Sequence, residues 1–244
     1  MGSEKKEIMP HPSWENRILY EKPKGSEKLT PKTLTEITNA WDAHAYLDEK
    51  GQLWIAAKVL HTILRTNKSS AEYILSGIVK ANKLNLGDDI YIRAFVIVGQ
   101  LTKEIENAGL KSRGAYLRFS EECLRAIRDS DRAKVLRGEY EEYLKEQKKG
   151  LKHRRIRKFD IKHDELTGER LVRKTAEFSH IRSCNRYKEL STYIENGLIV
   201  NKETHDIITA SGINNEEQLK FLCSEKNWDV AWHKEYQEFL KRNK

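Results

Sequence analysis

The spacing of apolar residues predicts helices over most of the chain between residues 35 and 149. From Leu53 to Leu64, apolar side chains recur at steps of three and four residues, which is typical of a helix with one buried face. Asn67 and Ser120 each precede a similar pattern and are expected to cap the helix N-termini. The run from Ile90 to Gly99 is rich in β-branched residues and fits a buried strand or a core helix equally well.

The pattern changes on both sides of this helical region. All four prolines lie within residues 1–34, where no period is sustained, so we expect an extended arm anchored by Trp14 and Tyr20. Near the C-terminus, Trp228 and Trp232 are expected to pack in the core. The predicted fold class is α+β, in four parts: an extended arm (1–34), a mostly helical domain (35–149), a small mixed domain (150–211) and a C-terminal helical segment (212–244).

Charge and composition narrow the range of partners. A net charge of +8 and an isoelectric point near 9.2 favour an anionic partner, with nucleic acid as the first candidate. No apolar run approaches the roughly 18 residues that cross a bilayer, and no signal peptide is recognised, so we expect a cytoplasmic protein without membrane contact. Cys123, Cys184 and Cys223 form no C-x-x-C pair and are expected to be free thiols.

The segment from residue 178 to 209 carries the candidate chemistry. Its pattern predicts a strand that ends near His180, a long loop, a second strand and then a helix. Asn196 and Gly197 form the turn pair before the second strand, where glycine tolerates a positive φ. Asn201 is the expected helix cap, so His205 would lie in the first turns of the helix and near His180.

This segment resembles the HNH nuclease motif, which is a ββα-metal fold. It is most similar to the branch that has Ala-His-Ile-Arg, a loop, Asn-Gly-Leu and a histidine on the helix. The corresponding residues here are Ser179-His180-Ile181-Arg182, Asn196-Gly197-Leu198 and His205. The upstream turn Glu165-Leu-Thr-Gly168 also matches. The resemblance covers about residues 155–211, or about a quarter of the chain.

The resemblance implies a metal-dependent endonuclease of restriction or phage-associated type that acts on double-stranded DNA. The catalytic set would be His180 as general base, Asn196 as a brace across the loop and His205 as a ligand of Mg²⁺ or Mn²⁺. Ser179 stands where many members of the family have a metal-binding Asp or His, and Thr209 stands where some have a second histidine. The remaining ligands are left open among Ser179 through water, Asp206, Asn201 and Glu177.

Basic residues around the motif are the expected nucleic-acid contacts, because phosphate contacts give affinity without sequence choice. They are Lys152, Arg154, Arg155, Arg157, Lys158, Arg173, Lys174 and Arg182. The helical domain is expected to recognise DNA or to dimerise. Cutting both strands requires two sites, which predicts a homodimer or sequential nicking. A non-catalytic DNA-binding protein on a degenerate HNH scaffold is the main alternative, and an RNA-cleaving toxin is another.

Overall fold

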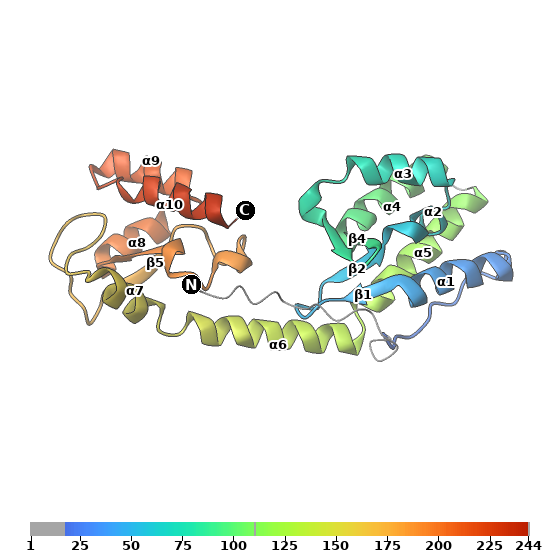
Figure 1. Ribbon diagram of the computed structural model, residues 1–244, viewed down its shortest axis with the longest axis horizontal. Coiled ribbons are helices and arrows are strands. Elements are labelled where there is room, and N and C mark those ends of the chain that lie inside the picture. The colour runs from blue at the N-terminus through green and yellow to red at the C-terminus, as the bar shows by residue number, and fades with distance from the viewer. Residues whose placement is uncertain (1–17, 110, 244) are drawn as a thin grey trace. The chain divides into compact units, whose positions relative to one another are not determined.

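The computed structural model describes residues 18–109 and 111–243 and divides the chain into two compact units (Figure 1). The first unit ends at Tyr140 and the second begins at Glu141. Helix α6 (Asp131–Lys148) contains this boundary, which therefore lies before the boundary predicted after residue 149. The α+β class is confirmed. Part of the predicted arm, including Trp14, lies outside the described residues.

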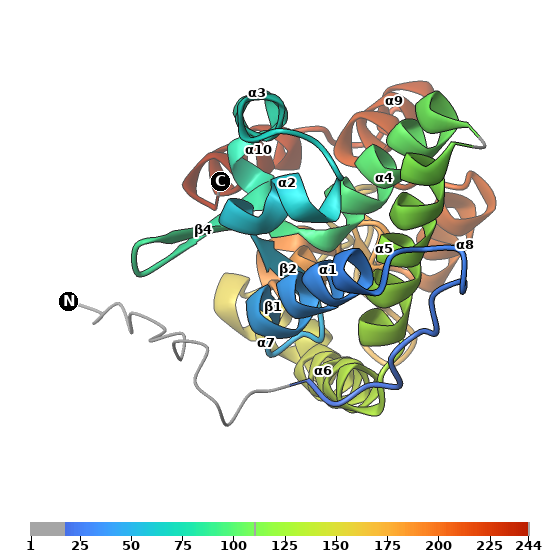
Figure 2. The same ribbon diagram turned by 90° about the vertical axis from the view of Figure 1, so that its right-hand side faces the viewer.

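The first unit combines helices with a four-stranded antiparallel sheet of strand order β1-β2-β4-β3. Its main elements are α1 (Pro31–His44), β1 (Ala45–Leu47), β2 (Leu53–Ala56), α2 (Leu60–Ile63), α3 (Lys68–Gly77), β3 (Lys83–Leu86), β4 (Asp89–Arg93), α4 (Ala94–Ala108) and α5 (Ser112–Arg128). Helices α1 and α4 both pack against α5 (Figure 2). Trp41, Ile55, Ile92 and Leu117 are fully buried in the core between these helices and the sheet.

Strand β2 corrects the prediction of one helix over residues 53–64. Strands β1 and β4 pair with it on its two sides, and all four of its residues are buried. Burial on both faces removes the alternation that marks a half-exposed strand, so the local pattern resembled a helix. The run from Ile90 to Gly99 contains both of its predicted alternatives, because β4 ends at Arg93 and α4 begins at Ala94.

The three predicted helix caps have different outcomes. Asn201 stands at the N-cap position of α8 (Lys202–Ala210), although its side chain makes no capping hydrogen bond. Asn67 is confirmed as the cap of α3, where its side chain accepts a hydrogen bond of 2.7 Å from the Ser70 N–H. Ser120 instead lies buried in the middle of α5, so the prediction of a cap there was wrong. Its hydroxyl accepts a hydrogen bond of 3.0 Å from the indole Nε1 of Trp41. Ser120 therefore provides the hydrogen-bond acceptor for the buried indole N–H of Trp41.

The second unit is built around a two-stranded hairpin followed by a helix. Its elements are α7 (Leu151–Phe159), β5 (Glu177–His180), β6 (Gly197–Val200), α8 (Lys202–Ala210), α9 (Glu216–Lys226) and α10 (Trp232–Arg242). Strands β5 and β6 are antiparallel, with His180 opposite Gly197, and α8 packs against β5 (Figure 1). The order of strand, loop, strand and helix follows the sequence prediction.

The C-terminal helices belong to the same core as the hairpin. Leu198 of β6 and Ile208 of α8 lie in one buried cluster with Leu219 of α9 and with Trp232 and Tyr236 of α10. The prediction that Trp232 is a core residue is confirmed, and Trp228 packs half-buried against the same cluster. Residues 212–243 therefore complete the ββα unit.

Asp164 fixes the turn before the hairpin to the start of α8. Its carboxylate is buried, with 2% of the residue exposed. One oxygen accepts hydrogen bonds from the N–H groups of Leu166 and Thr167, at 2.9 and 3.0 Å. The other accepts from the Asn201 N–H at 2.7 Å and from the Thr204 hydroxyl at 2.8 Å. The position of α8 is thus set by a fully hydrogen-bonded carboxylate.

All three cysteines are free thiols, as the sequence predicted. Burial raises the pKa of Cys123 to about 12 and that of Cys223 to about 11, which keeps both thiols protonated. Over the part of the chain that the structure describes, no helix is both long enough and apolar enough to cross a membrane.

Candidate functional site

His180 is the last residue of β5, where the long loop begins. Its ring packs edge-on against Phe178, with the ring centroids 4.9 Å apart. Its Nε2 lies 3.1 Å from the backbone carbonyl oxygen of Ser191 on the far side of the loop. Because a carbonyl only accepts hydrogen bonds, this contact assigns the ring proton to Nε2 and leaves the Nδ1 lone pair available.

The surroundings of His180 favour its neutral form. Burial lowers the pKa of His180 below its usual value of 6.5, and electrostatic interactions with Lys148 and His205 lower it further. The hydrogen bond to the Ser191 carbonyl raises the pKa; this effect is smaller than that of burial but larger than that of Lys148 or of His205. A neutral imidazole is the form that can take a proton from water.

Gly197 makes room for the ring that supports His180. A Cβ atom at this position would overlap the aromatic ring of Phe178, which in turn packs against His180. The φ of Gly197 is −163°, which is ordinary extended backbone. The glycine was predicted to provide a positive φ in a turn, whereas the structure shows that it is needed for space.

Asn196 fastens the loop that follows His180. Its side chain is fully buried, and its amide bonds to both backbone groups of Arg182: Oδ1 accepts from N–H at 3.0 Å, and Nδ2 donates to the carbonyl at 3.1 Å. The amide therefore makes the kind of bracing contact that the resemblance implied. Tyr236 of α10 also donates its hydroxyl to Asn196 Oδ1 at 2.7 Å. No local pattern marked Tyr236, because it lies 40 residues further along the chain.

His205 lies on α8 and faces the first residue of β5. Its Nδ1 is 3.2 Å from the Glu177 Oε2 atom, and the two side chains are 27% and 40% exposed. The ammonium group of Lys202, one turn earlier on α8, lies 3.7 Å from Glu177 Oε1 and 3.1 Å from Asp206 Oδ1. His205 is also close enough to His180 for their charges to interact.

Most of the other expected metal ligands do not join His205. Ser179 is 4% exposed and has only a hydroxyl to offer. The Asp206 carboxylate pairs with Lys202 rather than with His205. The Asn201 side chain is occupied by backbone groups, since it accepts from the Val172 N–H at 2.9 Å and donates to the Arg170 carbonyl at 3.2 Å.

His205 and Glu177 remain as the ligand-bearing pair. Among the described residues, no three His, Cys, Asp or Glu side chains converge on one point. Proteins commonly hold Mg²⁺ with only one or two carboxylates, and waters and substrate phosphates complete its shell. A pair of side chains at an open edge of the hairpin fits a cation of this kind.

Two of the expected phosphate-binding arginines are structural. Arg155 is 7% exposed, and its guanidinium pairs with both carboxylate oxygens of Glu165, at 2.8 and 2.6 Å, and donates to the Ile194 carbonyl at 2.9 Å. Arg182 pairs with Glu216 in the same two-pronged manner and packs over the ring of Tyr187. Arg155 was predicted to meet phosphate; because it is buried and paired within the protein, we expect its main role to be structural.

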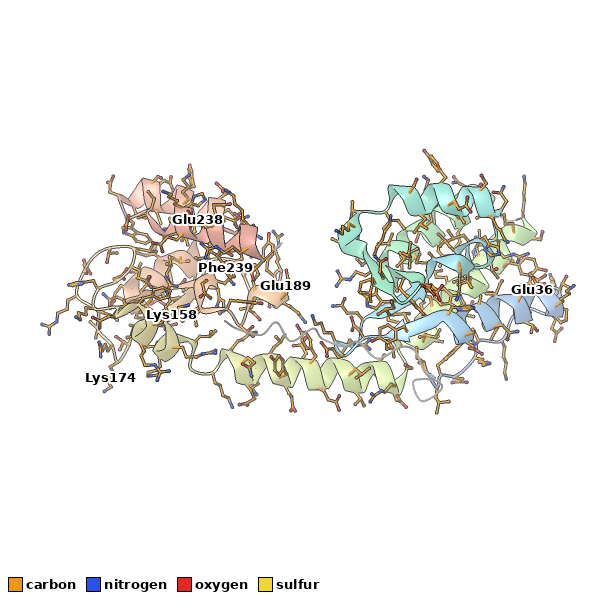
Figure 3. The ribbon with its side chains drawn as sticks, viewed as in Figure 1. Glu36, Lys158, Lys174, Glu189, Glu238 and Phe239 are labelled. Atoms are coloured by element: carbon orange, nitrogen blue, oxygen red, sulfur yellow. The ribbon has the colours of Figure 1, made fainter. Side chains whose placement is uncertain are left out.

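The remaining basic residues of the set are open to solvent or nearly so. Lys152 is half-buried, and Lys158 is exposed although it pairs with Glu195 at 2.7 Å. Figure 3 shows Lys158 on α7 and Lys174 on the loop before β5. We call the exposed members of the set the basic surface, which consists of Arg154, Arg157, Lys158, Arg173 and Lys174.

The described residues define a ββα unit in which a neutral histidine ends the first strand and a second histidine stands on the helix. Its loop is braced by a buried asparagine, and a basic surface lies on the same unit. Comparison with protein-family models, with curated proteins and with solved structures finds no match to this chain. The function is therefore inferred from the chemistry of these residues.

Proposed function

We propose that this protein is a metal-dependent HNH-type endonuclease that hydrolyses phosphodiester bonds in double-stranded DNA. The observation that carries the proposal is the state of His180: its Nε2 is held by the Ser191 carbonyl, its Nδ1 is available, and its pKa is lowered by burial. A histidine in this state takes a proton from water as the water attacks phosphorus. Asn196 would keep the loop, and with it His180, in position.

The other parts of the unit supply what this reaction needs. A divalent ion, Mg²⁺ or Mn²⁺, stabilises charge on the phosphate and on the leaving oxygen when it is bound. His205 on α8 would hold it on the side of the hairpin where Glu177 lies. The basic surface would hold the DNA backbone, which gives affinity and register but not sequence choice.

A nuclease with one such site per chain cuts both strands either as a homodimer or by sequential nicking. The first unit, with its own core and sheet, would recognise DNA or form the dimer. A cytoplasmic restriction or phage-associated enzyme fits this combination of a nuclease unit with a separate second unit.

A non-catalytic DNA-binding protein on the same scaffold is the second candidate. The observation that favours it is Ser179, which is buried and offers no carboxylate at the position where a metal ligand was expected. The basic surface would serve such a protein equally well, because phosphate binding does not depend on His180.

Cleavage of supercoiled plasmid tests the proposal. Wild type, His180→Ala and His153→Ala are incubated with Mg²⁺, Mn²⁺ or EDTA; His153 is an exposed histidine of α7 and serves as the matched control. We expect nicked or linear product that requires metal, persists in His153→Ala and falls about 100-fold or more in His180→Ala. Intact plasmid with a salt-dependent gel shift would instead support the binding protein, and preferential cleavage of structured RNA would support an RNA nuclease.

A further inference from the structure

We propose that Glu177 supplies the carboxylate of the divalent-cation site, with His205 as its partner ligand. This inference rests on the proposed nuclease function and specifies how the chain compensates for Ser179. Side chains alternate along a strand, so Glu177 and Ser179 lie on one face of β5, while Phe178 and His180 lie on the other. The ring contact between Phe178 and His180 agrees with this division.

Glu177 lies on the same face of β5 as Ser179, two residues earlier in the strand. Ser179 stands where many members of the HNH nuclease family have a metal-binding Asp or His. The Glu177 side chain reaches the helix, because Glu177 Oε2 lies 3.2 Å from His205 Nδ1. Two ligand atoms in adjacent positions of an octahedral shell with metal bonds of about 2.1 Å are about 3.0 Å apart. The observed separation is therefore close to that of two neighbouring ligands of one Mg²⁺ or Mn²⁺ ion.

The two ligands come from elements that are fixed independently of any ion. Glu177 is held in β5 by its pairing opposite Val200, and Asp164 fixes the first turn of α8. Both ligand side chains remain partly exposed, so waters and a DNA phosphate can complete the coordination shell. A catalytic cation requires ligands on well-positioned elements together with open coordination positions, and this pair offers both.

The ammonium group of Lys202 competes with a cation for the carboxylate of Glu177. It lies 3.7 Å from Glu177 Oε1 and 3.1 Å from Asp206 Oδ1, and the Lys202 side chain is 51% exposed. A long exposed lysine can move away when a divalent ion takes its place. Removal of this positive charge should therefore strengthen cation binding.

A second role for Glu177 has to be distinguished from that of a ligand. A carboxylate that accepts a hydrogen bond from one ring nitrogen of a histidine can simply orient the other nitrogen toward a metal. Glutamine keeps the hydrogen-bond acceptor and removes the charged ligand. The substitution Glu177→Gln therefore separates the two roles.

The chain contains a matched control for this substitution. Glu217 of α9 lies 3.1 Å from Nε2 of His233 of α10, which is the same kind of contact at nearly the same distance. This second pair lies outside the hairpin and α8. Glu217→Gln therefore removes one carboxylate next to a histidine without touching the proposed cation site.

The test is the binding of Mn²⁺ to the full-length protein without DNA, measured from the electron paramagnetic resonance signal of the free ion. We expect Glu177→Gln and His205→Ala to weaken binding about tenfold or more, because each removes one direct ligand and Glu177→Gln also removes a negative charge. Glu217→Gln should leave binding unchanged, and Lys202→Gln should strengthen it. Thermal unfolding of each variant shows whether it is folded. Wild-type affinity in folded Glu177→Gln, or no Mn²⁺ binding by the wild type, would overturn the inference.

Plasmid cleavage by the same variants separates this inference from the proposed function. If the wild type cuts plasmid, His180→Ala does not, and Glu177→Gln keeps its Mn²⁺ affinity, the nuclease stands and the role of Glu177 is refuted. If Mn²⁺ binding depends on Glu177 but no plasmid is cut, the cation site stands and the nuclease is refuted.

Discussion

The orientation and protonation of the His180 imidazole depend on one neighbour in its own strand and on several residues distant in the sequence. Phe178 supports its ring from the same strand, whereas Ser191, across the loop, fixes which nitrogen carries the proton. Lys148, from the end of α6, and His205, from α8, lower the pKa of His180 through electrostatic interactions. Burial and these interactions together make protonation of His180 less favourable, as the proposed role of general base at neutral pH requires.

The lowered pKa of His180 predicts where the rate of DNA cleavage by the proposed nuclease should fall on the acidic side of its pH profile. Protonated His180 cannot accept a proton, so the cleavage rate should fall as the pH drops through the pKa of this residue. Because the pKa of His180 is lowered from its usual value of 6.5, the midpoint of the decline in kcat/KM should lie below pH 6.5. Lys148→Gln removes one of the charges that lower this pKa and should move this acidic limb of the profile to higher pH.

The matched control for Lys148 is Lys149→Gln, since Lys149 is exposed and pairs with Glu146 at 2.5 Å. The measurement is kcat/KM for DNA cleavage between pH 5 and 8, a range of about three units around the usual histidine pKa. A wild-type limb above pH 6.5, or a limb that Lys148→Gln leaves in place, would contradict this account of His180.

Helix α7 carries one buried arginine and several exposed basic residues. Leu151 and Arg155 are four residues apart, so they share the buried face, whereas Arg154 and Arg157 are exposed. The buried arginine is paired with Glu165, whose Oε2 also accepts the Ile199 N–H at 2.6 Å. Arg155 thus ties α7 to the hairpin, and its exposed neighbours Arg154 and Arg157 are the ones that the proposed nuclease would use to contact DNA.

Substitutions on the buried face of α7 should lower stability, whereas substitutions on its exposed face should weaken DNA binding. Arg155→Ala leaves the carboxylate of Glu165 without its main partner, so we expect it to lower the free energy of unfolding by about 3 kcal/mol. Arg154→Ala and Arg157→Ala should change that free energy by no more than about 0.5 kcal/mol. Both should instead weaken DNA binding and reduce its salt dependence by about one released counterion each.

Urea denaturation gives the free energies, and fluorescence anisotropy with labelled duplex DNA at several salt concentrations gives the binding. Arg155→Ala that is as stable as wild type but defective in DNA binding would show that Arg155 contacts phosphate after all. Wild-type DNA affinity and salt dependence in both Arg154→Ala and Arg157→Ala would remove this face of α7 from the DNA interface.

The whole chain consists of two units, each with its own buried core. In the second unit the hairpin, α8 and the C-terminal helices contribute to the same apolar cluster. Tyr236 adds a polar link, because it bonds to Asn196 from α10. The loop after β5 and the C-terminal helices should therefore fold as one cooperative body.

Two fragments test this prediction for the whole molecule. Residues 141–244 should fold alone and unfold in one thermal transition, followed by circular dichroism. Residues 141–211 should not, since they lack Leu219, Trp232 and Tyr236 and would expose the cluster around Leu198 and Ile208. A cooperative transition in the shorter fragment would show that α9 and α10 are an independent addition.

The sequence by itself determined the order of elements around the candidate site. Strand, loop, strand and helix follow from local alternation and turn residues, and the spacing of His180, Asn196 and His205 is a property of that local order. The cap at Asn67 and the core position of Trp232 were predictable for the same reason. These features depend mainly on neighbours in the chain.

The tertiary structure alone decided which of these residues are available for chemistry. Arg155 and Arg154 are adjacent in one basic run, yet only contact with Glu165 makes the first structural. Glu177 met His205, and Tyr236 met Asn196, through elements brought together by folding. Strand β2 was missed because pairing on both sides buries all its residues. Burial and pairing depend on partners distant in the chain, and a local pattern does not contain them.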